Sequence, residues 1–374
     1  MNKKTKIIIA AEIFPPDIGG PASYGSKLAE ELVKRGYKTR VVTYGETKQD
    51  FGFKVSYVSR KIPFLLRQII YGVKLLFIAR GAKVVYAQGP SVGPAAILVK
   101  WLRFKRVVVK YVGDQSWQQI RVKGSTVPFE EYMDSYGKKW WDVKTWWIQR
   151  WQKFSLKKAD AVITPSLYLK AVLVKYLNID HSKIMVIPNA PVVHKTSTNL
   201  QPQQKVLYLG RVENWKGIEA LLEAMADLQE YKLLIAGAGS KLADYKQLAH
   251  DKKLDDEVEF VGQVSHDKLQ EYFKQCFCYI LGSEYEGMPH TVLEAWAHGL
   301  PVIVSDFPAN TELVKHEETG LVFEQGNAVQ LKTAIAKLWV NKDLRDKLSA
   351  NALEEVKKYT IDDMTSKTLK ILLG

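Results

Sequence analysis

Cysteine is scarce in this chain of 374 residues: the two present, Cys276 and Cys278, both lie in the segment QCFCYIL. In a strand, alternation would put both thiols on one face, where they cannot easily bond to each other. A metal centre would need more ligands nearby than this segment offers. We therefore expect buried thiols in a protein of the reducing cytoplasm.

Long hydrophobic runs are also absent. The longest, PFLLRQIIYGVKLLFIA, is interrupted by Arg67 and Lys74 and is shorter than the ~20 residues that a membrane-spanning helix needs. The amino-terminal segment MNKKTKIIIAAE lacks the longer apolar core and the cleavage site of a signal peptide. No extended Pro, Gly or Ser tract indicates disorder, and 47% hydrophobic residues over this length suit a globular protein of two domains.

Acidic residues are few in the first half of the chain. Residues 1–200 hold 34 Lys and Arg against 13 Asp and Glu, a balance of +21, whereas residues 201–374 hold 20 against 27, a balance of −7. Such a basic half predicts an acidic partner: a nucleic acid, an anionic lipid or a phosphate-bearing substrate. No helix-turn-helix, RNA-binding aromatic signature or zinc spacing is visible, which argues against nucleic acid.

Short β-branched runs alternate with helical periodicity along both halves, a pattern typical of parallel sheets. The strands predicted in the first half are KIIIAA, KTRVVTY, AKVVYAQ, KRVVVKYVG, DAVITPS and KIMVIPN. Those predicted in the second half are KVLYLG, KLLIAGAG, EVEFVG, FCYILGS and PVIVSD. Between the halves, PNAPVVHKTSTNLQPQQ has no periodicity and many turn-forming residues, which indicates a linker near residues 190–204.

We therefore predict an α/β fold with two doubly wound, Rossmann-like domains, residues 1–195 and 196–357. A last helix, 358–374, can pack back on the first domain. Ligands of open α/β sheets bind at the carboxyl ends of the strands, so we expect the active site in a cleft between two facing domains.

The loop after the first strand, EIFPPDIGG, carries Gly19 and Gly20 just before a helix that begins around Pro21. Glycines allow close backbone approach, and a helix N-terminus offers N–H groups to an anion. The loop does not match the G-x-G-x-x-G fingerprint, which weakens a nicotinamide interpretation. An ordinary tight turn explains the glycine pair equally well.

Two cations follow the strand YLG in the segment RVENWKG, namely Arg211 and Lys216. They could clamp a diphosphate, Arg through its planar fork and Lys as a point charge. The alternative is two solvated surface charges.

Two carboxylates belong to the segment LGSEYEGMPHTVLEAWAHGLPVIV: Glu286 before a predicted helix and Glu294 about one turn inside it. Pro289 suits the first helical position, and Gly299 suits the helix end. Backbone N–H groups near Gly287 could bind phosphate, and a carboxylate can accept two sugar hydroxyls. A Glu within the apolar run VLEAWA is costly unless it has a partner.

With these motifs in place, the sequence resembles the retaining, nucleotide-sugar-dependent glycosyltransferases of family 4, which have the GT-B fold. The resemblance covers nearly the whole chain. In the second half it rests on YLGRVENWKG, LLIAGAG, FVGQVS, EGMPHTVLEAWAHGLPVIV and ETGLVF. In the first half it rests on PPDIGG, LAEELVKRGYKTRVVT, DAVITPS and KIMVIPNA.

The resemblance implies a role for each matching residue. Arg211 and Lys216 would hold the donor diphosphate and, with Glu286, form the catalytic set. Glu294 would hydrogen-bond the ribose hydroxyls, Glu286 would hold hydroxyls of the transferred sugar, and Gly20 would let its loop approach the donor. The implied donor-binding residues are Gly19, Gly20, Arg211, Lys216, Glu286, Gly287, Met288, Pro289, His290 and Glu294.

Two segments depart from the family pattern. In YVGDQSW, Gly113 precedes Asp114, where many members carry His, and SDFPANTEL lacks the frequent Gly-rich turn. Recognition of a sugar or acceptor by the first domain then depends on Asp114, or on stacking by Trp117. A structural role is the alternative for either residue.

We expect a metal-independent enzyme. No Asp-x-Asp element lies near a strand end, since Asp255 and Asp256 belong to the charged stretch KKLDDEVEF. The seven His form no pair at metal-binding spacing, and His290 could face phosphate or cap the turn. The nucleoside diphosphate sugar is then a co-substrate, and no cofactor is expected.

Residues 138–154, KKWWDVKTWWIQRWQKF, hold five of the ten Trp. On a helix, one face carries Trp140, Val143, Trp147, Trp151 and Phe154, and the other carries Asp142, Thr145, Gln149 and Gln152. The aromatic face could anchor the protein in a lipid interface or bind the acceptor. The slightly favoured alternative is a core helix packed on the first sheet.

The expected function is transfer of a sugar, by a hexosyltransferase-like enzyme of glycan biosynthesis, to a glycan or lipid-linked acceptor held mostly by the basic domain. We expect a cytoplasmic protein that associates peripherally with the anionic inner face of the cell membrane. The alternatives are an epimerase or phosphorylase of the same fold, and a non-enzymatic protein that binds an anionic surface or nucleic acid. Donor-dependent release of nucleoside diphosphate would separate the enzyme from the binding protein.

Overall fold

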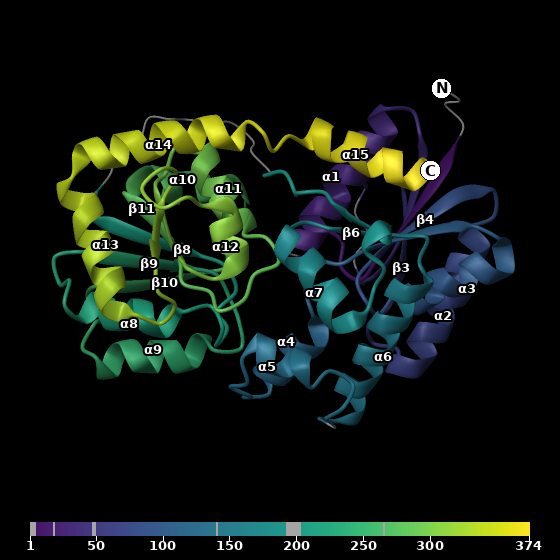
Figure 1. Cartoon of the computed structure of the whole chain (residues 1–374), viewed down its shortest axis with the longest axis horizontal. Coiled ribbons are helices and arrows are strands. Elements are labelled where there is room, and N and C mark those ends of the chain that lie inside the picture. Colours follow the sequence, from purple (N-terminus) through teal and green to yellow (C-terminus); the bar gives the residue numbers. More distant parts are fainter. Residues whose placement is uncertain (1–4, 18, 47–49, 140, 192–202, 265) are drawn as a thin grey trace. The chain divides into compact units, whose positions relative to one another are not determined.

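The computed structural model describes residues 5–17, 19–46, 50–139, 141–191, 203–264 and 266–374 (Figure 1). The chain forms two compact units: the first comprises Met1–Ile120, Phe129–Ala190 and Thr360–Gly374, and the second Arg121–Pro128 and Pro191–Tyr359. Trp140, most of the predicted linker and the domain boundary predicted at 195/196 lie outside the described residues. Residues 121–128, predicted in the first domain, pack with the second unit instead.

The first unit is built on a parallel sheet of seven strands in the order β3-β2-β1-β4-β5-β6-β7. Its strands are β1 Lys6–Ala11, β2 Lys38–Tyr44, β3 Lys54–Val58, β4 Ala82–Gln88, β5 Arg106–Lys110, β6 Ala161–Thr164 and β7 Ile184–Val186. The central strands are runs of Ile, Val and Ala that are buried on both faces. This is the composition expected of strands covered by helices on both sides.

Helices connect these strands (Figure 1). They are α1 Gly20–Lys34, α2 Phe64–Ile78, α3 Gly93–Arg103, α4 Gln115–Val122, α5 Phe129–Asp134, α6 Val143–Lys158, α7 Leu167–Leu177, the 3-10 turn His181–Lys183 and the C-terminal α15 Ile361–Leu373. The last residues of α4 belong to the second unit.

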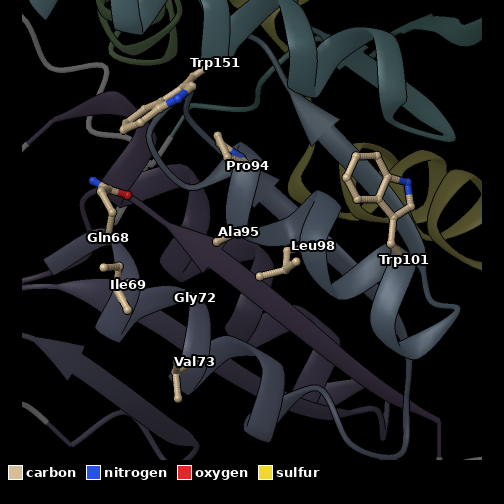
Figure 2. Close-up of a pocket in the computed structure, with 9 residues that line it drawn as sticks. All are labelled: Gln68, Ile69, Gly72, Val73, Pro94, Ala95, Leu98, Trp101 and Trp151. Atoms are coloured by element: carbon tan, nitrogen blue, oxygen red, sulfur yellow. The ribbon is translucent and has the colours of Figure 1, made fainter. Parts of the chain in front are cut away.

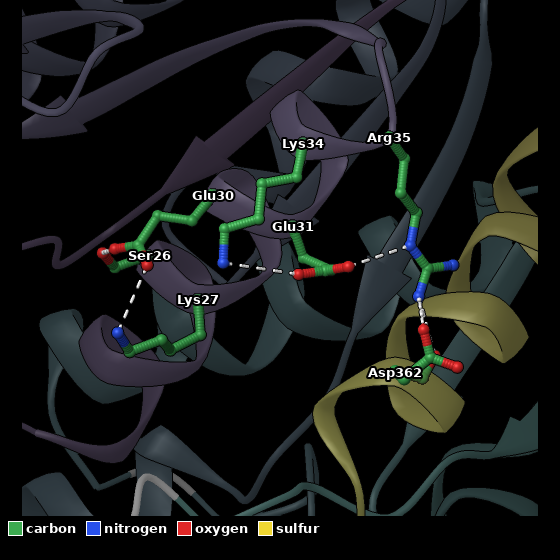
Figure 3. Close-up of polar contacts among 7 residues, drawn as sticks. All are labelled: Ser26, Lys27, Glu30, Glu31, Lys34, Arg35 and Asp362. Carbon is green, nitrogen blue, oxygen red and sulfur yellow. Dashed lines mark hydrogen bonds and ion pairs between the residues drawn. The ribbon is translucent and has the colours of Figure 1, made fainter. Parts of the chain in front are cut away.

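The C-terminal helix α15 belongs to the core of the first unit. Met364, Leu369 and Leu372 join the cluster formed by one face of β1, β4 and β5 together with α1. At the helix start, an Arg35 nitrogen lies 2.7 Å from an Asp362 oxygen and another lies 3.2 Å from Glu31 (Figure 3). Apolar burial dominates this attachment, because exposed ion pairs contribute little.

Two substitutions in α15 should separate these contributions. Leu372 is fully buried, so Leu372→Ala should lower the unfolding free energy of the first unit by about 2–5 kcal/mol. The Asp362 side chain is 85% exposed, so Asp362→Ala should cost less than about 1 kcal/mol. Urea denaturation followed by circular dichroism measures both, and equal effects would contradict this account.

The second unit has a parallel sheet of six strands in the order β10-β9-β8-β11-β12-β13. The strands are β8 Lys205–Leu209, β9 Lys232–Ala236, β10 Val258–Gly262, β11 Cys278–Leu281, β12 Val302–Ser305 and β13 Leu321–Phe323. The helices are α8 Ile218–Ala226, α9 Leu242–Asp251, α10 His266–Gln275, α11 His290–Ala297, α12 Pro308–Leu313, α13 Ala328–Val340 and α14 Lys342–Val356. Helices α8, α9 and α13 cover one face, and α10 and α11 cover the other. The predicted fold class, two doubly wound α/β units, is confirmed.

The two cysteines are buried and free, but they do not share a face of a strand. Cys276 precedes β11 and packs in the cluster beside α10 and α11, whereas Cys278 lies within β11 and packs beside α8. The expectation of one shared face is wrong because the strand begins two residues later than the alternation suggested. Burial raises the pKa of the Cys276 thiol to about 12, which keeps it protonated and unreactive at neutral pH.

The Trp-rich helix α6 turns its polar face inward. Its buried residues include Thr145, Gln149 and Gln152, whereas the Trp147 side chain is 42% exposed. Gln152 Nε2 lies 2.5 Å from the Asp114 carboxylate, and Gln149 Nε2 lies 2.7 Å from the Tyr132 hydroxyl. The helix does bury one face, but the expectation that the aromatic face is the buried one is wrong: a buried carboxylate and hydroxyl need donors, and the glutamines supply them.

Candidate functional site

The candidate site lies at the carboxyl edge of the second sheet. Strands β9, β8 and β11 are neighbours and run in parallel, so the loops that follow them emerge side by side. Arg211 and Lys216 lie in the loop after β8, Gly237 and Gly239 after β9, and Glu286 after β11.

Glycines bring the loop after β8 against the loop after β11. Gly217 has φ 69°, and a Cβ built on it would lie 2.1 Å from the carbonyl oxygen of Gly282. Only glycine fits there, because the backbone conformation is left-handed and a second backbone occupies the space of a side chain. The Glu284 N–H donates to the Trp215 carbonyl at 2.8 Å, which ties the two loops together.

The loop after β9 packs equally closely on the other side of the β8 loop. A Cβ on Gly237 would lie 1.8 Å from the Gly210 carbonyl oxygen, and one on Gly239 would lie 2.0 Å from that of Val212. The buried carboxylate of Glu213 accepts hydrogen bonds from the backbone and hydroxyl of Ser240. The β8 loop is thus held between two neighbours, and its cations have defined positions.

Lys216 and Glu286 form an ion pair in this edge. Their Nζ and Oε1 atoms are 2.6 Å apart, and their side chains are only 11% and 14% exposed. The Ser283 hydroxyl donates to the same carboxylate oxygen at 2.8 Å. Partial burial strengthens the attraction between the two charges. It would also strengthen the hydrogen bonds of an anion or a hydroxyl that bound beside them.

Arg211 is exposed at the start of the same loop. Its guanidinium carbon lies 5.3 Å from the centre of the buried Trp215 ring, a cation–π contact. The Tyr208 hydroxyl donates to its carbonyl oxygen at 2.6 Å. The second predicted cation is therefore oriented rather than freely solvated.

Helix α11 follows the Glu286 loop, with Pro289 as its N-cap residue. Gly287, Met288 and Pro289 are buried, and His290 is half-buried at the first helical position. Glu294 lies one turn inside, where burial raises the pKa of its carboxyl to about 7. The predicted residues Arg211, Lys216, Glu286, Glu294 and the 287–290 turn thus belong to adjacent loops and one helix start.

The raised pKa of Glu294 predicts a pH effect on stability. Its pKa is 4.5 in the unfolded chain and about 7 when folded, so the folded state retains a proton that the unfolded state releases between these values. Its contribution to the unfolding free energy therefore falls as pH rises from 4.5 to 7. At pH 8, Glu294→Gln should be more stable than wild type, by at most ~3 kcal/mol.

Urea denaturation of wild type and Glu294→Gln at pH 5 and pH 8 measures this difference. Glu354→Gln is the control, since the Glu354 side chain is 73% exposed. An equal difference between wild type and Glu294→Gln at both pH values would show that the carboxyl titrates normally.

Sequence reasoning missed three carboxylates. Glu213 is one of them, and the signal for it was its position in RVENWKG, between the two predicted cations. Glu284 pairs with the buried Arg121 at 2.9 Å, and Arg121 also contacts Asn214. No spacing in the sequence signals a contact between residues 163 positions apart. The third, Glu12, directly follows β1.

In the first unit, the candidates have different surroundings. Gly19 has φ 150° and precedes α1, which begins at Gly20. Glu12 accepts hydrogen bonds from the Ser91 backbone and the Gln115 amide, and burial raises the pKa of its carboxyl. Its position directly after a strand was the available signal.

Asp114 and Trp117 have no exposed side-chain surface. Asp114 accepts a hydrogen bond from the Trp117 N–H at 2.8 Å, near the start of α4, and the Trp117 ring packs edge-on against Phe129 at 5.6 Å. These contacts support the structural alternative, since a sugar would find no surface of either side chain to bind.

Within the described part of the chain, no group of three or more His, Cys, Asp or Glu side chains is placed to hold a metal ion. None of the described helices combines the length and apolarity needed to cross a bilayer.

Two family models match the chain. The model described as Glycosyltransferase Family 4 matches residues 18–190, and that described as Glycosyl transferases group 1 matches residues 193–355. Each model covers one of the predicted domains, and the family expected from the motifs is confirmed.

Similar proteins are named as glycosyltransferases. An uncharacterized glycosyltransferase of Methanocaldococcus jannaschii is 28% identical over 243 residues, which cover 60% of this chain and 62% of that protein. A GDP-mannose-dependent alpha-(1-6)-phosphatidylinositol monomannoside mannosyltransferase of Mycobacterium tuberculosis is 27% identical over 223 residues, 56% of this chain and 58% of that protein. The chain thus matches less than two thirds of the length of either relative.

Among solved structures, Anabaena HepE in complex with UDP and glucose superposes with a TM-score of 0.79 at 15% identity, covering 98% of this chain and 99% of that one. At this identity the likeness concerns the fold.

Proposed function

The chain belongs to glycosyltransferase family 4, and we propose that it transfers a sugar from a nucleoside diphosphate donor to an acceptor with retention of anomeric configuration. The observation that carries this proposal is the partly buried Lys216–Glu286 pair, which glycine contacts between neighbouring loops hold in the loop that also carries Arg211. A cation pair next to a hydroxyl-binding carboxylate suits a diphosphate bonded to a sugar.

Lys216 and Arg211 act on the leaving group. Transfer breaks the bond between the anomeric carbon of the sugar and a β-phosphate oxygen, and negative charge develops on that oxygen. The Lys216 ammonium and Arg211 guanidinium would stabilise this charge, an electrostatic contribution that requires no rearrangement at the moment of reaction. The acceptor hydroxyl oxygen forms the new bond to the anomeric carbon, and its proton passes to the departing β-phosphate oxygen.

The carboxylates position the donor. Glu286 and the backbone after Gly287 would hold hydroxyls of the transferred sugar, and Glu294 would accept from the ribose hydroxyls. Met288 and His290 carry backbone N–H groups in this turn, whereas Pro289 has none and limits the turn's conformation. The names of relatives support a nucleotide donor: one is GDP-mannose-dependent, and HepE is solved with UDP and glucose.

The acceptor we propose is a glycan or a lipid-linked sugar, met at an anionic membrane surface on the cytoplasmic side. The +21 balance of residues 1–200 supports this class of partner, and one relative is named for a phosphatidylinositol-linked substrate. An epimerase or a non-catalytic binding protein is less favoured, because neither explains the leaving-group cations beside the hydroxyl-binding carboxylates.

Substitution of the site should abolish most activity. Lys216→Ala and Glu294→Ala should each lower the rate of donor-dependent nucleoside diphosphate release by roughly 100–1,000-fold, since one preorganised contact is worth ~3 kcal/mol in the transition state. Circular dichroism should show an intact fold. The donor is first identified by thermal shift across a panel of nucleotide sugars.

Lys357→Ala and Glu354→Ala are the matched controls, because these side chains, at the end of α14, are 67% and 73% exposed. Both controls should retain wild-type rates. Wild-type turnover by Lys216→Ala or Glu294→Ala would overturn the site assignment.

We also predict a metal-independent reaction, because the cations that meet the diphosphate are side chains. Transfer rates should stay unchanged after treatment with EDTA and dialysis. Loss of activity with EDTA, followed by recovery on adding Mg²⁺ or Mn²⁺, would refute the leaving-group role given to Lys216 and Arg211.

A further inference from the structure

Helix α2 exposes an apolar stripe along its whole length. Leu65, Ile69, Val73 and Phe77 recur every fourth residue and are 68%, 63%, 49% and 63% exposed. On the opposite side, Tyr71 and other residues are buried. A helix at an ordinary protein surface turns charged and polar residues outward, whereas the exposed face of α2 is largely apolar.

The apolar surface continues onto α3. Leu98, Trp101 and Leu102 are 41%, 51% and 57% exposed, and Phe104, just beyond the helix, is 92% exposed. Their spacing gives α3 a second stripe beside that of α2. Monomeric soluble proteins rarely expose contiguous apolar surface on this scale, which marks it as an interaction site.

A groove of about 420 Å³ runs between the two helices. Figure 2 shows residues of α2 on one side and of α3 on the other, with the Trp151 side chain of α6 at one end. Gly72 and Ala95 line it where the helices approach closely, since a Cβ on Gly72 would lie 3.9 Å from that of Ala95. Apart from Gln68, its lining is apolar.

Aromatic rings of α6 join this surface. Trp151 stacks on Phe64 of α2 at 5.6 Å, and Phe154 packs edge-on against Trp101 of α3 at 5.7 Å. Trp147 is 42% exposed. We call the exposed apolar residues of α2 and α3, the 64–151 ring pair and Trp147 the aromatic-apolar surface. Tryptophan side chains favour the interface between hydrocarbon and headgroups.

The segment that carries α2 and α3 has side-chain charges of one sign only. Residues 51–113 contain twelve Lys and Arg and no Asp or Glu. Lys61 and Arg80 are exposed near the two ends of α2, and Arg150 is exposed on α6. Cations with long apolar stems can lie along hydrocarbon while their charges reach anionic headgroups.

We propose that the aromatic-apolar surface inserts into the headgroup and acyl boundary of an anionic bilayer, with a lipid acyl chain in the groove between α2 and α3. The proposal rests on the proposed function, because a lipid-linked acceptor is what would bring the enzyme to a membrane. A second copy of the chain fits poorly, because exposed cations such as Lys61 and Arg80 would face their own copies and repel them. An anionic lipid complements both the apolar area and the charge.

Sedimentation with vesicles tests the proposal on the full chain. Wild type should bind vesicles of phosphatidylcholine mixed with phosphatidylglycerol and release as salt rises, and it should bind phosphatidylcholine alone weakly. Ile69→Ser with Phe77→Ser should weaken binding by tenfold or more, whereas the double variant of Val329 and Val340 to Ser should not. These control residues are 68% and 78% exposed in the second unit.

Insertion has a separate readout. Acyl chains brominated along their length should quench part of the tryptophan fluorescence of the bound protein, and Trp101→Phe and Trp147→Phe should each reduce the quenched fraction. Binding that is salt-sensitive yet unquenched, and unchanged in Ile69→Ser with Phe77→Ser, would overturn the proposal in favour of simple electrostatic adsorption. Dimers without lipid that this variant abolishes would overturn it in favour of a second copy.

The two proposals fail separately. Nucleoside diphosphate release measured without vesicles should be equal in wild type and in Ile69→Ser with Phe77→Ser, since neither residue belongs to the candidate site. Lipid binding without donor-dependent release would refute the proposed function alone. Release without any binding to anionic vesicles would refute the membrane surface and leave the sugar transfer itself supported.

Discussion

The backbone contact between Gly217 and Gly282 is the constraint on which the candidate site depends. A side chain on Gly217 would collide with the Gly282 carbonyl at 2.1 Å, so the loops after β8 and β11 meet only because neither carries a Cβ there. Lys216 and Glu286 are near neighbours of these glycines in the chain, and their 2.6 Å ion pair follows from the approach. The ion pair of the site therefore depends on two positions that carry no side chain.

A buried carboxylate has a comparable effect in the first unit. Asp114 has no exposed surface, and leaving such a group without donors would cost several kcal/mol. The Ser116 hydroxyl and the Trp117 N–H donate to one carboxylate oxygen, and Gln152 of α6 donates to the other at 2.5 Å, which turns the polar face of α6 toward the core. The aromatic face, including Trp147 and Trp151, must then face outward or pack on neighbouring helices. The polar contacts of α6 thus help to explain why its aromatic side chains are partly exposed.

These two cases show how far the sequence could predict the structure. Runs such as KIIIAA and PVIVSD predicted the strands because parallel strands are buried on both faces. Arg211, Lys216 and Glu286 could be singled out because they follow strands, and topology alone brings such loops together. The division of α6 into two faces was correct, but periodicity does not say which face turns inward. That direction depends on Asp114, which lies elsewhere in the chain, and the Arg121–Glu284 contact has the same non-local origin.

The apolar outward faces of α2 and α3 need a different explanation. Among the described residues, no buried polar group accounts for them in the way that Asp114 accounts for α6. Leu65, Ile69 and Phe77 are each more than 60% exposed, and polar replacements there would lose little packing. Exposing these apolar side chains to water is unfavourable in free energy, and they add little to the stability of the fold. Adjacent cations without carboxylates exclude many protein partners by charge alone. An anionic lipid surface meets both conditions, and it would hold a lipid-linked acceptor and the basic unit in the same layer.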